Sequence, residues 1–255
     1  MNVLWIGGPP GSGKSTVARR LARRHGLRLY ASDTRTWAHR DRAVAAGLPG
    51  ALRGESLTPA QRAALPVEEQ LAMWLHEERG PMTVDDVREL PSSPLTVVEG
   101  TQVVPAMLPP GGRAVWLVPP TEVLRERLTA RHGPGEVPGL YLPLGELIAA
   151  EVARAGVAVI TAEDAFDEVE RFFAADLARG PLAEGRQERW RLLREANAAV
   201  AEQYRAFLAK PWNTTESAAV ARPFLCECSD SECDASLSLA IDDLPPTPLL
   251  AADHR

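Results

Sequence analysis

A glycine-rich segment directly follows the first apolar run and constrains the fold of this chain more than any other feature. Residues 3–6 read VLWI and residues 7–16 read GGPPGSGKST, so residues 8–15 fit G-x-x-x-x-G-K-[ST] without a mismatch. Glycines permit a tight strand-to-helix turn whose backbone N–H groups point inward, beside the positive end of the helix. This pattern predicts a phosphate-binding loop; the alternative is a glycine-rich turn that binds nothing. The residues expected to contact a nucleotide are Gly8, Pro9, Pro10, Gly11, Ser12, Gly13, Lys14, Ser15 and Thr16.

Short apolar runs alternate with helical patterns up to about residue 180. Five apolar strands alternating with helices indicate an α/β fold, with a five-stranded parallel sheet covered on both faces. Residues 34–90 are mostly helical by composition, with breaks at glycine and proline. The strands are expected at residues 3–6, 27–32, 95–99, 114–118 and 157–160, and helices at 14–25, 121–132 and 166–177.

Four residues are expected to carry the chemistry of a bound nucleotide. Lys14 would reach the β- and γ-phosphates, and the Ser15 hydroxyl would bind Mg²⁺. Asp33 and Glu99 end neighbouring strands, at the edge where open α/β sheets bind ligands. We expect Asp33 to be the general base, and Glu99 to contact the substrate or to hold the metal through a water molecule. Asp33 is also suited to cap the next helix, and the two roles are compatible.

The segment after the fourth expected strand is rich in arginine. Arg127 and Arg131 are four residues apart and share one helical face. A mobile cationic segment here can close over the phosphates and stabilise the charge that develops during phosphoryl transfer, so both arginines are predicted to be catalytic. A solvated basic face is the alternative.

Together, the phosphate loop, Asp33, the VVEG segment at 97–100 and the arginine-rich helix resemble the small P-loop (Walker A) kinases. That group contains shikimate, gluconate and adenylate kinases and chloramphenicol phosphotransferase, and the resemblance covers residues 1–178. It implies a nucleoside-monophosphate-kinase-like P-loop NTPase fold that uses ATP, or GTP, with Mg²⁺. Asp33 matches the hydroxyl-activating Asp of the family, and Arg127 and Arg131 match its lid arginines.

The resemblance also implies how the chain is divided. Residues 1–180 would form the kinase domain, in which residues 34–94 are a helical substrate-binding insert and residues 121–140, approximately, a lid. The residues themselves, and not the resemblance, indicate a boundary at Gly180-Pro181, after which residues 181–255 would add a C-terminal helix and an acidic tail with cysteines. Asp33-Thr34-Arg35 replaces the D-x-D of shikimate kinase, which argues against shikimate. VEGTQVVP at 98–105 resembles 2-phosphoglycerate-kinase-like proteins more weakly.

A GTPase switch is an alternative of a different class. It would need an N-K-x-D guanine-binding sequence, which the chain lacks. It would also need D-x-x-G after the third strand, where this chain has Glu99-Gly100. The sequence therefore favours an ATP-dependent kinase that phosphorylates a hydroxyl over an NTP-binding switch or regulatory protein.

The insert contains residues that suit an anionic or ring-containing substrate. Arg35, His39 and Arg40 are expected to bind it, and tryptophans such as Trp74 can stack on a ring. Solvated arginines and core tryptophans are the alternative. The size of the insert suggests a substrate larger than a three-carbon acid. The candidates are an antibiotic or other natural product, phosphorylated for self-protection, or a nucleoside, nucleotide or sugar acid of metabolism.

The C-terminal region combines an amphipathic helix at about 184–209 with a cysteine-bearing tail. The helix is expected to pack on the main domain. Cys226, Cys228, Cys233 and His254 are candidate ligands for a structural Zn²⁺ ion, with a flexible tail and free thiols as the alternative.

The charge and the apolar runs of the chain limit the kinds of partner that we expect it to bind. The formal net charge of −6 lies entirely in residues 223–255, which hold seven acids and one base, and residues 1–222 are neutral. No basic face for nucleic acid is therefore predicted. No apolar run reaches the roughly 18 residues of a bilayer span, and the N-terminus lacks a signal-peptide pattern, so we expect a cytoplasmic protein. The expected partners are a nucleotide and a small hydroxyl compound; the oligomeric state is not predicted.

Overall fold

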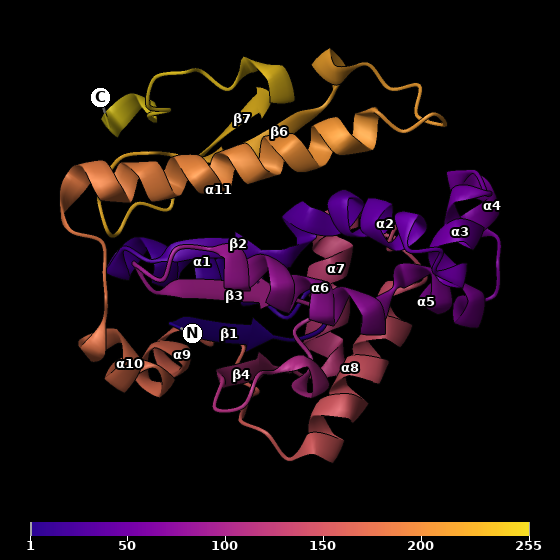
Figure 1. The fold of residues 1–255 in the computed structure, drawn as a ribbon, viewed down its shortest axis with the longest axis horizontal. Coiled ribbons are helices and arrows are strands. Elements are labelled where there is room, and N and C mark those ends of the chain that lie inside the picture. The colour runs from indigo at the N-terminus through magenta and orange to yellow at the C-terminus, as the bar shows by residue number, and fades with distance from the viewer. Residues whose placement is uncertain (1, 255) are drawn as a thin grey trace.

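The computed structural model describes residues 2–254, and its centre is a five-stranded parallel sheet (Figure 1). The strand order is β2-β3-β1-β4-β5, so the first strand lies in the middle of the sheet. The predicted α/β fold class is confirmed. The strands are β1 (Val3–Gly7), β2 (Arg28–Ala31), β3 (Thr96–Gly100), β4 (Arg113–Leu117) and β5 (Val159–Ile160).

The central strand β1 and its neighbour β3 are buried, because most of their side chains are apolar and the sheet is covered on both faces. Every residue of β3 is buried, and β1 is buried from Leu4 onward. They pair with Ile6 opposite Glu99 and Gly7 opposite Gly100. Since parallel strands end at the same edge, this register brings the start of the glycine-rich loop beside Glu99.

Helices cover both faces of the sheet, with one apolar cluster on each. Within residues 2–180, the α-helices outside the insert are α1 (Lys14–His25), α7 (Thr121–His132), α8 (Tyr141–Ala155), α9 (Phe166–Phe172) and α10 (Ala174–Arg179). On one face, Leu21 of α1 and Phe166 of α9 belong to the cluster around β1; on the other, Ile148 of α8 packs in the cluster of Trp5 and Trp116. The sequence predicted α1 and α7 with these bounds, merged α9 with α10, and missed α8.

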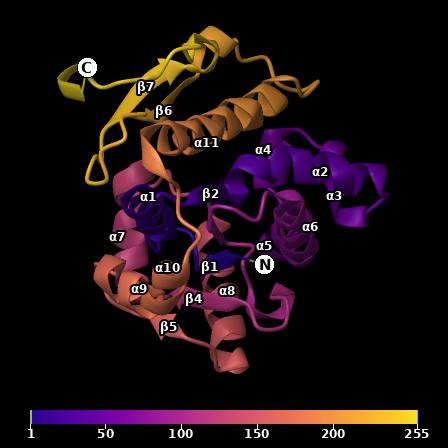
Figure 2. The same cartoon turned by 60° about the vertical axis from the view of Figure 1, so that its left-hand side comes forward.

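Five α-helices lie between β2 and β3, where the helical insert was expected. They are α2 (Thr36–Ala45), α3 (Pro49–Glu55), α4 (Pro59–Ala63), α5 (Val67–Trp74) and α6 (His76–Glu89). Proline opens α3 and α4, and Thr58 and Gln61 form a capping box on α4. Figure 2 shows α2 and α3 on the opposite side of the molecule from β5.

The C-terminal region consists of a long helix, which the sequence predicted at about 184–209, and a hairpin, which it did not. These elements are α11 (Gly185–Leu208), β6 (Ala221–Leu225) and β7 (Ser236–Ala240), with β6 antiparallel to β7. Phe224 and Ile241 of this region are buried in a cluster with Ala201 of α11. On its other side, α11 pairs with the main sheet through Arg28 and Glu195, whose Nε and Oε2 atoms are 3.2 Å apart. Thus α11 lies between the hairpin and β2 (Figures 1 and 2).

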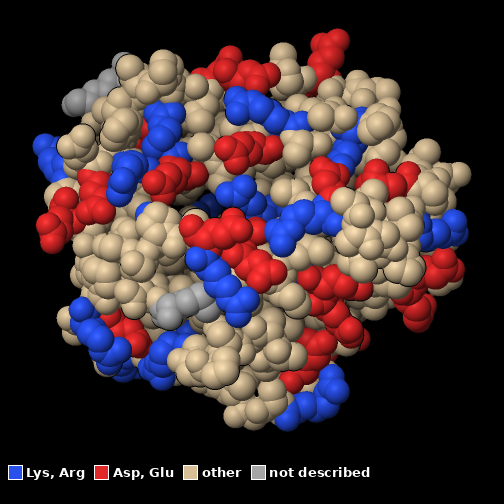
Figure 3. Space-filling view, viewed as in Figure 1, with Lys and Arg blue, Asp and Glu red and all other residues tan. Residues whose placement is uncertain are grey.

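The surface carries charges of both signs. Basic and acidic side chains are intermixed on the face shown in Figure 3. An ion pair joins α1 to the C-terminal region, with Arg24 Nη2 at 2.9 Å from Glu232 Oε2. Within residues 2–254, none of the helices has the length and apolar character that crossing a membrane requires.

Candidate active site

The glycine-rich loop links the end of β1 to the start of α1. Gly8, Gly11 and Gly13 have φ angles of 144°, 81° and 91°, where L side chains are strained. A Cβ atom on Gly8 would lie 2.4 Å from the Leu117 carbonyl oxygen of β4. Gly13 is the N-cap of α1 and offers no side-chain acceptor. The first N–H groups of α1 are therefore available to an anion, as phosphate binding requires.

Lys14, Ser15 and Glu99 lie together beneath this loop. Lys14 is 5% exposed, and the Ser15 hydroxyl donates to Glu99 Oε2 at 3.0 Å. Burial raises the pKa of the Glu99 carboxyl, and the positive charge of Lys14 acts in the opposite direction. Hydroxyl and carboxylate oxygens are the ligand type that Mg²⁺ prefers, so this group fits a Mg²⁺ ion that accompanies a nucleotide.

A cavity of about 280 Å³ opens beside the loop. Asp33 is exposed in it, within the short 3₁₀ turn Ser32–Arg35 that follows β2. The capping role considered for Asp33 is not observed, because Arg35 holds the N-cap position of α2. Beyond the loop residues, the lining includes Asp33, Thr36, Trp74, Thr101, Arg131 and Tyr141. The cavity thus places a carboxylate in the same space as Lys14 and Ser15.

Sequence reasoning missed Arg79, Thr101 and Tyr141. Arg79 of α6 is buried, and its Nη2 donates to the Ser32 carbonyl at 3.1 Å and to Thr36 Oγ1 at 2.9 Å, which holds the turn that carries Asp33. Burial lowers the pKa of Arg79 to about 10, while the nearby Asp33 charge opposes this shift. Thr101 could have been found from its place directly after Glu99-Gly100. Arg79 and Tyr141 had no local signal, because only the folded chain brings them near Asp33.

The two arginines of α7 have different surroundings. Arg131 lines the cavity. Arg127 Nη1 donates to the loop carbonyls of Gly11 at 3.4 Å and Ser12 at 3.2 Å, and its Nη2 donates to the Glu163 carbonyl at 2.6 Å. Arg127 therefore holds the phosphate loop to the segment after β5, whereas Arg131 is available to a ligand in the cavity.

The three substrate-binding candidates of the insert lie outside this cavity. Arg35 points to α11, where its Nη1 is 3.6 Å from Glu202 Oε2. His39 is fully buried with Nε2 at 2.8 Å from Asp86 Oδ2, and burial lowers the pKa of His39. Arg40 is buried and donates to a backbone carbonyl of α5 at 3.1 Å. The fold uses these side chains to join α2 to its neighbours and does not bring them to Lys14 and Asp33.

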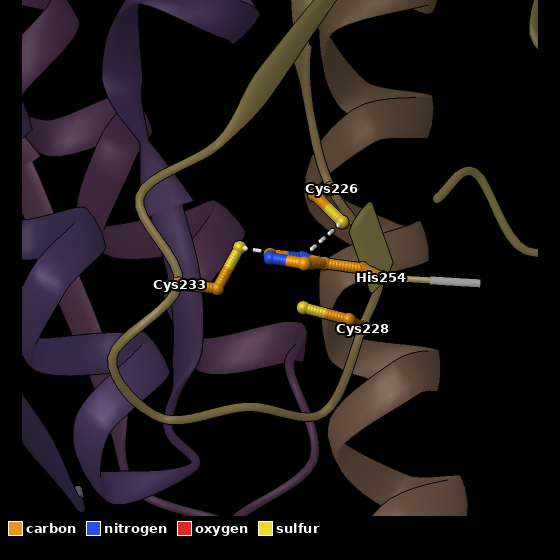
Figure 4. Close-up of side chains that lie close together, drawn as sticks. All are labelled: Cys226, Cys228, Cys233 and His254. Atoms are coloured by element: carbon orange, nitrogen blue, oxygen red, sulfur yellow. Dashed lines mark hydrogen bonds between the residues drawn. The ribbon is translucent and has the colours of Figure 1, made fainter. Parts of the chain in front are cut away.

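Figure 4 shows the four candidate zinc ligands close together. They lie by the last turn of α1, where Arg23 contacts the Cys228 carbonyl, at the far end of this helix from the loop. The Sγ atoms of Cys226, Cys228 and Cys233 and a ring nitrogen of His254 all lie within 4.8 Å of one another. The cysteines are not in disulfides. Cys226 and Cys233 are buried, and the tail around them is folded against α11.

The fold and the loop geometry define a P-loop nucleotide-binding protein of the α/β class. A family model described as "AAA domain" matches residues 4–137, which is just over half of the chain. The chain therefore belongs to this family of P-loop proteins, as the resemblance to small P-loop kinases led us to expect. No curated protein matches the chain significantly.

Three solved kinases resemble the chain in part. Shikimate kinase from Acinetobacter baumannii has a TM-score of 0.43 and 17% identity, covering 69% of this chain and 93% of that one. A gluconokinase from Sinorhizobium meliloti has a TM-score of 0.41 and 23% identity, covering 69% and 91%. A sugar kinase from a Janibacter species has a TM-score of 0.40 and 16% identity, covering 70% and 98%. Because these TM-scores are low, no conclusion about function rests on them.

Proposed function

We propose that this protein transfers the γ-phosphoryl group of ATP to a hydroxyl of a small molecule, with Mg²⁺ as cofactor. The observation that carries the proposal is the shared cavity of Lys14, Ser15 and Asp33. A loop that only held a nucleotide would need no exposed carboxylate at this point. An acceptor hydroxyl, by contrast, needs a group that takes its proton as the new O–P bond forms.

Each residue of the site has a role in this scheme. The loop N–H groups and Lys14 would bind the phosphates, and Ser15 with Glu99 would hold the Mg²⁺ ion, which neutralises phosphate charge when it is bound. Asp33 would orient the acceptor hydroxyl and accept its proton. Arg131 would stabilise the charge on the transferred group, and Arg127 would keep the loop in place.

The lining of the cavity supports an acceptor with a ring. Trp74 and Tyr141 supply aromatic surface, while Thr101 and Thr36 supply hydroxyls. We propose helices α2 to α6 as the acceptor-binding insert, acting through Trp74 and Thr36 in place of Arg35, His39 and Arg40. A natural product, including an antibiotic modified for self-protection, fits this lining better than a three-carbon acid, and a nucleoside or sugar acid is the metabolic alternative.

The acceptor can be found by a screen. ATP consumption by the full-length protein would be measured against sugars, sugar acids, nucleosides and aromatic natural products, with mass spectrometry of the product. A product heavier by one phosphoryl group supports the proposal. ATP hydrolysis that every compound leaves unchanged, with no phosphorylated product, contradicts it and favours a switch or regulatory protein.

Two variants test the roles once an acceptor is known. Lys14→Ala should abolish turnover while the circular dichroism spectrum stays the same. Asp33→Asn should lower kcat by roughly 10²–10⁴-fold with little change in ATP affinity. Asp85→Asn, at an exposed carboxylate of α6, is the matched control and should behave like wild type. If Asp33→Asn changes only KM, Asp33 positions the substrate and is not the base.

A further inference from the structure

The cluster of Cys226, Cys228, Cys233 and His254 has the dimensions of a tetrahedral metal site. With Zn–S bonds of about 2.3 Å and a Zn–N bond of about 2.0 Å, a tetrahedron places sulfurs about 3.8 Å apart and nitrogen about 3.5 Å from each sulfur. His254 Nδ1 lies 3.4 Å from both Cys226 Sγ and Cys233 Sγ, and all four ligand atoms are within 4.8 Å of one another. Only small side-chain shifts separate this arrangement from a complete coordination shell.

A buried arginine beside the cluster supplies an independent observation. Arg23, in the last turn of α1, is 8% exposed, and its Nη1 lies 3.0 Å from the Cys228 carbonyl oxygen and 3.6 Å from Cys228 Sγ. Its Nη2 donates to the Cys226 carbonyl. Within residues 2–254, no carboxylate forms an ion pair with this guanidinium, although buried charges in proteins are normally paired.

A metal ion in the cluster would supply the missing partner. Three thiolates and a neutral imidazole around Zn²⁺ carry a net charge of −1, directly beside Arg23. The Ala251 N–H also points at Cys226 Sγ, at 3.3 Å, as amide donors do around zinc-bound thiolates. Three soft thiolates and one imidazole make four ligands, which suits Zn²⁺ in a closed site.

We propose that Cys226, Cys228, Cys233 and His254 form a closed structural Zn²⁺ site that, together with Arg23, fastens residues 221–254 to α1 and α11. The site lies at the end of α1 opposite the phosphate loop, so it takes no part in phosphoryl transfer. Glu227, between two of the ligands, is buried and accepts from Arg194 at 2.6 Å and from Asn197 at 2.8 Å on α11. The bonds of Glu227 form a second attachment to α11, and the metal orders the segment that carries Glu227.

Elemental analysis of full-length protein purified without added metal tests the proposal directly. We expect about one zinc per chain in wild type, and less than about a tenth in Cys228→Ser and His254→Ala. Asp253→Asn, at the exposed neighbour of His254, should keep its zinc. Less than about a tenth of an equivalent in folded wild type, or full zinc in both ligand variants, would overturn the site.

Two measurements on wild-type protein avoid variants that fail to fold. Replacement of zinc by Co²⁺ should give the intense visible absorption of tetrahedral thiolate coordination; a weak octahedral spectrum contradicts the proposal. All three thiols should resist alkylation until a chelator is added, and equal labelling with and without chelator would refute a metal-bound state.

The role of Arg23 can be separated from ligand binding. Arg23→Met should lose zinc to a chelator at least about tenfold faster than wild type, because the negative site loses its counter-charge. Arg20→Met, at an exposed arginine of the same helix, should match wild type. If the two variants release zinc at the same rate, Arg23 does not stabilise the site.

Discussion

Glu99→Gln should make the protein more stable and less active. Glu99 is 2% exposed, and burial, the largest influence on it, raises its pKa against the opposing charge of Lys14. Each unit by which folding raises the pKa of a carboxyl costs about 1.4 kcal/mol of stability once that carboxyl is ionised. The new amide N–H groups would cost about 1–3 kcal/mol if one stays unsatisfied, while the amide oxygen can still accept from Ser15. We therefore expect a net gain in the free energy of unfolding on the order of 1 kcal/mol near pH 8.

The raised pKa of Glu99 determines how the stability difference between the variant and wild type changes with pH. A carboxyl whose pKa is raised in the folded state contributes stability that is fully present below its unfolded value, here 4.5, and is lost as pH rises through the folded value. Glutamine does not titrate. The difference in unfolding free energy between variant and wild type should thus grow in favour of the variant from pH 4.5 upward, until Glu99 is ionised in the folded protein.

Urea denaturation at a series of pH values, without nucleotide or metal, measures this difference. In parallel, Glu99→Gln should lower Mg²⁺-dependent activity about 10–100-fold. Glu126→Gln, at an exposed carboxylate of α7, is the matched control, and its stability should stay within about 0.5 kcal/mol of wild type. A variant less stable than wild type at every pH would show that pairing with Lys14 outweighs burial, and a difference independent of pH would refute the reasoning.

Three further variants test the roles proposed for individual side chains. Arg127→Ala removes two hydrogen bonds to loop carbonyls, so steady-state kinetics should show KM for ATP raised about tenfold. Arg131→Ala should mainly lower kcat, and the same kinetic profile in both variants would contradict the different roles proposed for the two arginines. Asp86→Ala removes the hydrogen-bond partner of the buried Tyr30 hydroxyl, at 2.6 Å, and of His39, at 2.8 Å. Urea denaturation should show the free energy of unfolding lowered by about 2–4 kcal/mol, and a loss below about 1 kcal/mol would show that water replaces the carboxylate.

Most of the fold and the phosphate loop could be predicted from the sequence because their requirements are local. Buried parallel strands appear as short apolar runs, and the loop needs its glycines, Lys14 and Ser15 at fixed spacing. Helix α8 and the β6–β7 hairpin escaped prediction. Helix α8 carries proline and glycine near its start, and β6 contains Pro223. Tertiary packing stabilises both where local preferences are weak.

The sequence by itself determined a P-loop chain with a carboxylate after the second strand and three cysteines and a histidine in its tail. Only the tertiary structure decided which polar side chains meet. Arg35, His39 and Arg40 looked suited to a substrate, yet the fold turns them to Glu202, Asp86 and α5. Arg79 and Tyr141 gave no signal, and the fold places them beside Asp33. The reason is physical: a helix exposes different faces to core, cavity and solvent, and its rotation is set by contacts distant in sequence.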